Sequence, residues 1–151
     1  QAQTVVEGLV ISNPYDGYFH SLLGSVYGRK GMHEEAQEEY SIALELNPKD
    51  LASYVNRAEI LLQHGEIESA LEDLKKAVEL DPKGEEPFGI RARALAQATV
   101  SVLEEAMRDK GMDVGKVKAQ GEKMVQKERA ASKPASGPSS KASAKAAPKK
   151  K

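Results

Sequence analysis

Glycines and basic residues near the first quarter of the chain have the composition of a loop that cradles phosphate. They are Gly24, Gly28, Arg29, Lys30 and Gly31. The G-x-x-x-x-G-K-[ST] spacing that aims backbone N–H groups at phosphates is absent, however. These glycines are therefore assigned to structural positions, and we expect no nucleotide site.

Histidines, serines and carboxylates are the other candidates for chemistry. His20, His33 and His64 are too scattered for a predicted metal set, and the sequence has no Cys to supply a thiolate. The serines lie on predicted helix faces, at caps or in the C-terminal tail, and the carboxylates follow surface patterns rather than catalytic pairs. We therefore predict no enzymatic activity, no metal and no cofactor.

One fixed spacing, that from Gly24 to Ala58, organises most of the chain. Seven pairs of residues obey it: Gly24 and Ala58, Tyr27 and Leu61, Gly31 and Gly65, Ala36 and Ala70, Tyr40 and Leu74, Ala43 and Ala77, and Pro48 and Pro82. Small residues suit places where two helices approach closely, and bulky ones fill the gaps between units. Glycine ends one helix of each unit and proline follows the other. Each period therefore predicts two antiparallel helices joined by a tight turn.

This period and pattern resemble the tetratricopeptide repeat (TPR) family, whose units are roughly 34 residues long. The resemblance implies an all-α fold, a TPR helical-hairpin solenoid of about 2.5 repeats with a C-terminal capping helix. We expect a TPR domain at 1–108, made of the second helix of a truncated repeat (1–14), repeats at 17–50 and 51–84, and the capping helix at 85–108. The chain is thus expected to open inside a repeat, with its N-terminus truncated.

The C-terminal region differs in composition from the repeats. We expect a polar segment at 109–129 that could be helical, and a disordered tail at 130–151, because Ala, Ser, Lys, Pro and Gly bury too little apolar surface to fold. From Lys127 onward there are eight Lys and Arg against one acid, a net charge of +7, which leaves −8 for the rest. Weak, salt-dependent contact of this tail with nucleic acid or another anionic polymer is one hypothesis, and a solubilising role is the other.

The predicted repeats offer a groove for a protein partner. Stacked hairpins curve so that their first helices line a concave face. The first-helix positions that point away from the second helices predict a peptide-binding groove of Tyr18, Ser21, Ser25, Arg29, Ala52, Val55, Asn56, Glu59, Leu62, Gln63, Gly89, Arg93 and Ala96. Small apolar residues with a few polar groups suit an extended or amphipathic segment. The alternative is a face that a partial array merely leaves exposed.

The third unit carries a closer resemblance. The run from Asn56 to Ala70, which follows Tyr27-Gly28-Arg29-Lys30-Gly31, is similar to the class II chaperones of type III secretion systems. This resemblance implies a cytoplasmic protein that holds hydrophobic translocator subunits in a secretion-competent state by binding an extended segment in its groove. The region that such chaperones use for dimerisation is absent here, so a homodimer remains open, and the basic tail is not a family feature.

Two other protein-binding roles can be compared with the residues. Some repeat proteins clamp the C-terminal carboxylate of a chaperone with Lys and Asn, but Ser21 and Ser25 occupy those places and Glu86 would repel a carboxylate. A general TPR adaptor, which brings two proteins together in a complex, needs the same groove and remains the alternative. No apolar run approaches the roughly 18 residues of a membrane helix, so we expect no membrane insertion.

Overall fold

The structure is a computed structural model that describes residues 1–111 and residue 115. The described part contains six helices and no strand, which confirms the predicted all-α fold of helical hairpins. They are α1 (Ala2–Ser12), α2 (Gly17–Arg29), α3 (His33–Leu46), α4 (Leu51–Gln63), α5 (Ile67–Leu80) and α6 (Pro87–Asp109). Most of the predicted polar segment 109–129 and all of the predicted disordered tail 130–151 lie outside the described residues.

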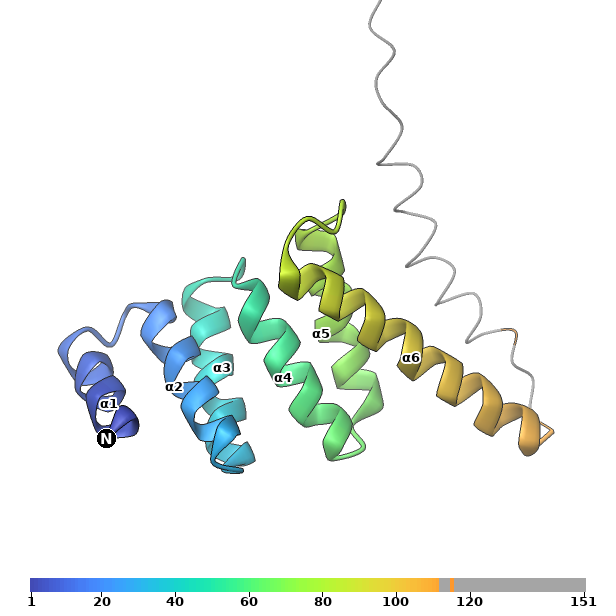
Figure 1. The fold of residues 1–151 in the computed structure, drawn as a ribbon, viewed down its shortest axis with the longest axis horizontal. Helices are drawn as coiled ribbons and strands as arrows, with labels where there is room; N and C mark the ends of the chain where they lie inside the picture. Colours follow the sequence, from blue (N-terminus) through green and yellow to red (C-terminus); the bar gives the residue numbers. More distant parts are fainter. Residues whose placement is uncertain (112–114, 116–151) are drawn as a thin grey trace, which may run out of the picture.

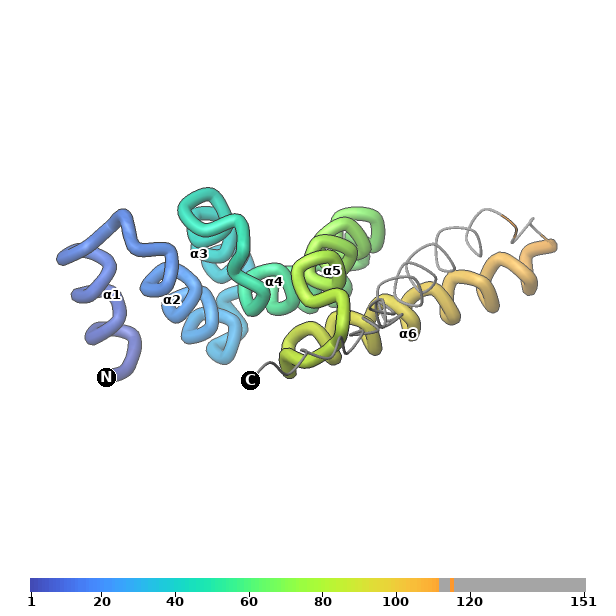
Figure 2. Tube along the Cα trace, turned by 90° about the horizontal axis from the view of Figure 1, so that it is seen from above, coloured from blue at the N-terminus to red at the C-terminus, as the bar shows by residue number. Residues whose placement is uncertain are grey.

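The helices form two hairpins, α2 with α3 and α4 with α5, flanked by single helices (Figure 1). The α3 helix also contacts α4, and α5 contacts α6, so each hairpin packs on the next element. Seen from above, α3 and α5 lie on one side of the array and α2, α4 and α6 on the other (Figure 2). The first helices α2, α4 and α6 contact one another in turn and together make one face.

The turn inside each hairpin is built the same way in both repeats. Gly31 and Gly65 adopt φ of +75° and +78°, the left-handed conformation that glycine takes without steric cost. Past the first glycine, the Met32 N–H donates to the Tyr27 carbonyl at 3.0 Å, and past the second the Glu66 N–H donates to the Leu61 carbonyl at 2.9 Å. This bonding satisfies carbonyls at the helix ends and stops α2 and α4 at the predicted glycines.

Aspartates start the first helix of each hairpin. Asp16 accepts a hydrogen bond from the Tyr18 N–H at 3.0 Å, and Asp50 accepts one from the Ala52 N–H at 3.2 Å. Such caps satisfy an N–H group that has no partner within the helix. The two caps are one repeat period apart, so the repeat spacing extends to the helix starts.

The apolar core runs along the array. Its largest cluster joins α4, α5 and α6, and its fully buried members include Ala58, Leu74 and Ala77. A smaller cluster of Ala36, Tyr40 and Ile60 joins the two hairpins, and Val6 packs against α2. Each helix pair thus buries apolar surface only against its neighbours, as expected for a stacked repeat array.

Candidate functional site

The predicted groove residues lie at very different depths on the face made by α2, α4 and α6, which we call the first-helix face. Tyr18, Arg29 and Gln63 are exposed. Six residues are half-buried: Ser25, Ala52, Asn56, Glu59, Leu62 and Arg93. Four are buried: Ser21, Val55, Gly89 and Ala96. The surface that a partner can touch is therefore smaller than the predicted set.

The expectation that Ser21, Val55, Gly89 and Ala96 line an open groove is wrong. Val55 and Ala96 belong to the main core cluster, and Val55 has no exposed surface at all. Ser21, Val55 and Gly89 occupy one repeat position in three successive units, and all three are buried. Their small size indicates close packing between elements, which the repeat period alone does not reveal.

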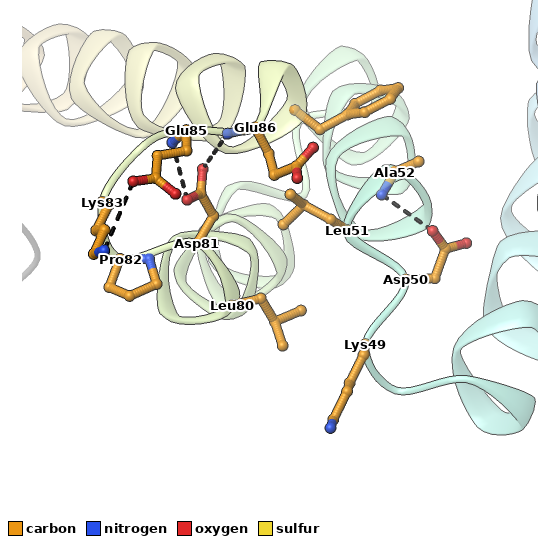
Figure 3. Close-up of a pocket in the computed structure, with 11 residues that line it drawn as sticks. Lys49, Asp50, Leu51, Ala52, Leu80, Asp81, Pro82, Lys83, Glu85 and Glu86 are labelled. Carbon is orange, nitrogen blue, oxygen red and sulfur yellow. Dashed lines mark hydrogen bonds and ion pairs between the residues drawn. The ribbon is translucent and has the colours of Figure 1, made fainter.

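Gly89 owes its identity to the side chain of Asp81. A Cβ atom built on Gly89 would lie 1.9 Å from Asp81 Oδ2 and 2.7 Å from its Cγ. The Asp81 carboxylate accepts a hydrogen bond from the Gly84 N–H at 3.0 Å. It also accepts one from each of the Glu85 and Glu86 N–H groups at 3.1 Å (Figure 3). The Asp81 side chain thus fixes the chain entering α6 and leaves room only for glycine opposite it.

The electrostatics of Asp81 follow from this arrangement. Burial raises the pKa of Asp81, but the backbone hydrogen bonds it accepts and the nearby Arg93 together lower it by more. The guanidinium of Arg93 also donates to the Asp81 carbonyl, with Nη1 3.7 Å from Oδ2. The predicted groove residue Arg93 is therefore engaged with the loop before α6, where it holds the start of that helix.

Hydrogen-bonded hydroxyls join α2 to α4 across the first-helix face. The hydroxyls of Ser21 and Ser53 lie 2.9 Å apart, and Ser53 donates to Asp50 Oδ2 at 2.6 Å. Next along the face, Ser25 accepts from the Tyr40 hydroxyl at 3.2 Å and from Asn56 Nδ2 at 3.5 Å. The polar atoms of this part of the face are therefore partly satisfied within the protein before any ligand arrives.

The Tyr40 hydroxyl stays protonated as the donor in this network. Burial raises the pKa of Tyr40, and the hydrogen bonds that involve Ser25 and Asn56 offset this only in part. A neutral phenol can donate to Ser25, which in turn donates to the Ser21 carbonyl at 3.0 Å. The network thus fixes the side chains between the two hairpins.

Two arginines at one repeat position have different partners. Arg57 donates to both carboxylate oxygens of Asp73 at 2.7 Å and to Ser41 at 3.0 Å, and the hydrogen bond to Asp73 raises the pKa of Arg57. Arg91, one repeat period later, instead pairs with Glu59 at 2.5 Å from Nε to Oε1. Sequence reasoning missed Arg91 as a member of the first-helix face, and its repeat relation to Arg57 gives no signal for it, because Arg57 binds Asp73 on α5 instead.

A cleft of about 690 Å³ lies at one edge of the array, outside most of the predicted groove. It opens between the connection that precedes α4 and the connection that precedes α6 (Figure 3). Its lining residues are Lys49, Asp50, Leu51, Ala52, Leu80, Asp81, Pro82, Lys83, Glu85, Glu86 and Phe88. Only Ala52 belongs to both sets. Lys49 and Lys83 are one repeat period apart, but their spacing in the sequence does not by itself predict a cleft.

His20, another candidate for chemistry, is tied into the fold. His20 Nδ1 lies 2.7 Å from Glu39 Oε2, and its Nε2 lies 3.0 Å from the Pro14 carbonyl oxygen. Within residues 1–111 and 115 there is no group of three or more His, Cys, Asp or Glu suited to a metal ion. In the same residues, every helix is too short or too polar to cross a membrane.

Sequence comparison identifies the repeats. The tetratricopeptide repeat family model matches residues 21–85. Protein NPGR2 of Arabidopsis thaliana is 38% identical over 52 residues, which are 34% of this chain. The chain spans only 7% of the length of that curated relative. The match therefore concerns a short stretch of repeats and not the whole of that protein.

Two solved structures share the arrangement of helices. The crystal structure of MamA has a TM-score of 0.61 at 19% identity, and the likeness covers 85% of this chain and 68% of that one. The type III secretion translocator chaperone SycD of Yersinia enterocolitica has a TM-score of 0.55 at 28% identity, covering 73% of this chain and 72% of SycD. The likeness to MamA concerns the fold alone. Arrays of this kind are typical of modules that bind other proteins. Residues 21–85 are thus tetratricopeptide repeats, and the array of helices that contains them resembles SycD.

Proposed function

We propose that this protein binds an extended segment of a partner protein on the first-helix face. The observation that carries the proposal is the continuity of α2, α4 and α6, which contact one another in turn on one side of the array. Exposed and half-buried residues follow this side, from Tyr18 through Ala52 and Asn56 to Leu62. An extended segment can place alternate side chains along such a surface.

The binding surface combines apolar contact with a few polar groups. Tyr18 is 67% exposed and lies beside Phe19, with ring centroids 5.9 Å apart in an edge arrangement. Asn56 offers an amide whose bond to Ser25 is long, at 3.5 Å. Aromatic side chains and amides of this kind supply contact area and orientation in protein interfaces. The Glu59–Arg91 pair marks the part of the face where α4 meets α6.

The narrower proposal is a cytoplasmic chaperone of translocator-like proteins of type III secretion. Its support is the likeness to SycD, a type III secretion translocator chaperone, which covers 73% of this chain and 72% of SycD. A chaperone needs a surface that covers an aggregation-prone segment and requires no nucleophile. The second candidate is a general adaptor, which would use the same first-helix face to bring two proteins together in a complex.

The distinguishing experiment is a pull-down from the native lysate with the parent chain and two variants. Tyr18→Arg with Ala52→Arg adds bulk and charge on the first-helix face. The control, Glu38→Gln with Ser69→Arg, makes the same net charge change at exposed positions of α3 and α5. Substitutions at exposed or half-buried sites are expected to leave the fold intact, which circular dichroism can verify.

The expected result is one secreted, membrane-active protein that the parent and the control retain and the first-helix variant loses. Several soluble partners with the same dependence would favour the adaptor over the chaperone. Equal retention by all three proteins would contradict binding on the first-helix face. The hypothesis that the basic tail contacts anionic polymers concerns residues outside the described part and stays a separate prediction.

A further inference from the structure

Two histidines meet at the edge of the array where the hairpin turns lie. Although 31 residues separate them in sequence, His33 Nδ1 lies 3.1 Å from His64 Nε2, and their ring centroids are 5.2 Å apart. His33 begins α3, and His64 follows the last residue of α4. The contact therefore links the first hairpin to the second at the ends of their helices.

The distance between the two nitrogens matches the distance between two ligands of one metal ion. With metal–nitrogen bonds of about 2.0–2.1 Å, two ligands at a right angle stand about 2.9 Å apart and at a tetrahedral angle about 3.3 Å apart. The observed 3.1 Å lies between these values. Imidazole nitrogen is a preferred ligand of Zn²⁺, Ni²⁺ and Cu²⁺.

A third side chain is placed to orient one of the rings. The Gln37 amide lies 3.4 Å from Nδ1 of His64, on the side of the ring away from His33. The amide oxygen and nitrogen of glutamine can exchange places, so Gln37 can accept a hydrogen bond from Nδ1–H. That bond fixes the tautomer in which Nε2 carries the lone pair, and metal-ligating histidines commonly have such a partner.

The site is open to a cation from solvent. Both rings lie in a region open to solvent, and His64 is exposed. In the sequence, the carboxylates Glu34, Glu35 and Glu66 and the bases Arg29 and Lys30 all lie within four residues of one of the two histidines. We propose that His33 and His64 form a two-histidine site for a divalent first-row transition metal, such as Zn²⁺ or Ni²⁺, that links the two hairpins. Water fills the remaining coordination positions.

Titration of the tag-free full chain with Zn²⁺ alone and with Ni²⁺ alone tests the site. His20 is the other histidine and there is no cysteine, so few competing ligands exist. We expect saturable one-to-one binding by calorimetry at submillimolar metal, and a melting temperature that rises with metal concentration. His33→Gln and His64→Gln should each weaken binding by about tenfold or more, and Gln37→Leu should weaken it by roughly tenfold.

The control is Gln63→Ala, which removes an exposed neighbour of His64 and keeps both imidazoles. It should bind metal as the parent does. Melting without metal verifies that each variant is folded. Binding that survives the loss of either histidine alone, or the absence of saturable binding by the parent, would overturn the proposal. A loss of metal-induced stabilisation in both histidine variants, with Gln63→Ala unchanged, supports it.

Discussion

Replacing Gly89 by alanine tests how the loop before α6 is held. The new Cβ would lie 1.9 Å from Asp81 Oδ2 and 2.8 Å from Asp81 Cβ. Rotation of the carboxylate alone does not relieve the contact, since the Asp81 Cβ is also too close. The Asp81 side chain must therefore move by about 1 Å or more to reach normal van der Waals separation.

The energetic result can be worked from the bonds that Asp81 makes. Its carboxylate accepts three backbone hydrogen bonds at 3.0–3.1 Å, and losing a hydrogen bond to a charged group costs about 1.5–3 kcal/mol. Alanine regains about 1 kcal/mol over glycine inside a helix. We expect Gly89→Ala to lower the free energy of unfolding by about 1–3 kcal/mol, as overpacking typically does.

Urea unfolding, monitored by circular dichroism, measures this free energy. An equal dependence of the free energy on urea concentration in variant and parent shows that both expose the same amount of surface on unfolding. The control is a double-mutant cycle with Asp81→Gly, which removes the Cβ and the carboxylate together. In that background Gly89→Ala should become neutral or stabilising. Equal destabilisation in both backgrounds, or no effect in the parent, would refute the contact as the reason for glycine.

Three further predictions concern the core and its charges. Asp73→Ala should lower the free energy of unfolding by about 3 kcal/mol, the low end for buried ion pairs, because the Arg57 side chain keeps 23% exposure. An unchanged midpoint of urea unfolding would contradict the pairing. Gly24→Ala should lower the free energy of unfolding by about 1–3 kcal/mol, because the new Cβ would lie 2.8 Å from the Tyr40 ring. A melting temperature equal to or above that of the parent would contradict this. The lowered pKa of Asp81 makes its stabilisation fully present above about pH 4, the unfolded value, and lost as the pH falls through the folded pKa. The stability of Asp81→Asn should therefore lack this pH-dependent contribution of the Asp81 carboxylate. Identical acid-unfolding profiles for variant and parent would contradict the prediction.

The sequence was informative about backbone conformation. Gly31 and Gly65 stand where only a left-handed residue closes the turn, and both have positive φ. Pro48 and Pro82 follow α3 and α5 closely, as expected of residues that cannot continue a helix. Glycine permits the left-handed conformation and proline restricts φ, so the spacing of these residues predicts where the helices of each hairpin end.

Burial on the first-helix face was harder to predict, because it depends on contacts between units. Val55 and Tyr18 both stand on first helices, yet one has no exposed surface and the other is 67% exposed. The small residues at the repeat position of Ser21 and Gly89 indicate a close approach, but their partners Ser53 and Asp81 come from tertiary packing. The His33–His64 contact was missed for the same reason, since stacking brings together residues far apart in sequence.

Site-specific photocrosslinking tests the central claim most directly. A photoreactive residue replaces Ala52 on the first-helix face or, as the control, Ser69 on α5, and the full chain is irradiated with its captured partner. We expect Ala52 to crosslink to one contiguous segment of the partner and Ser69 to give little product. Crosslinks from Ser69 alone, or equal crosslinks from both positions, would contradict binding on the first-helix face.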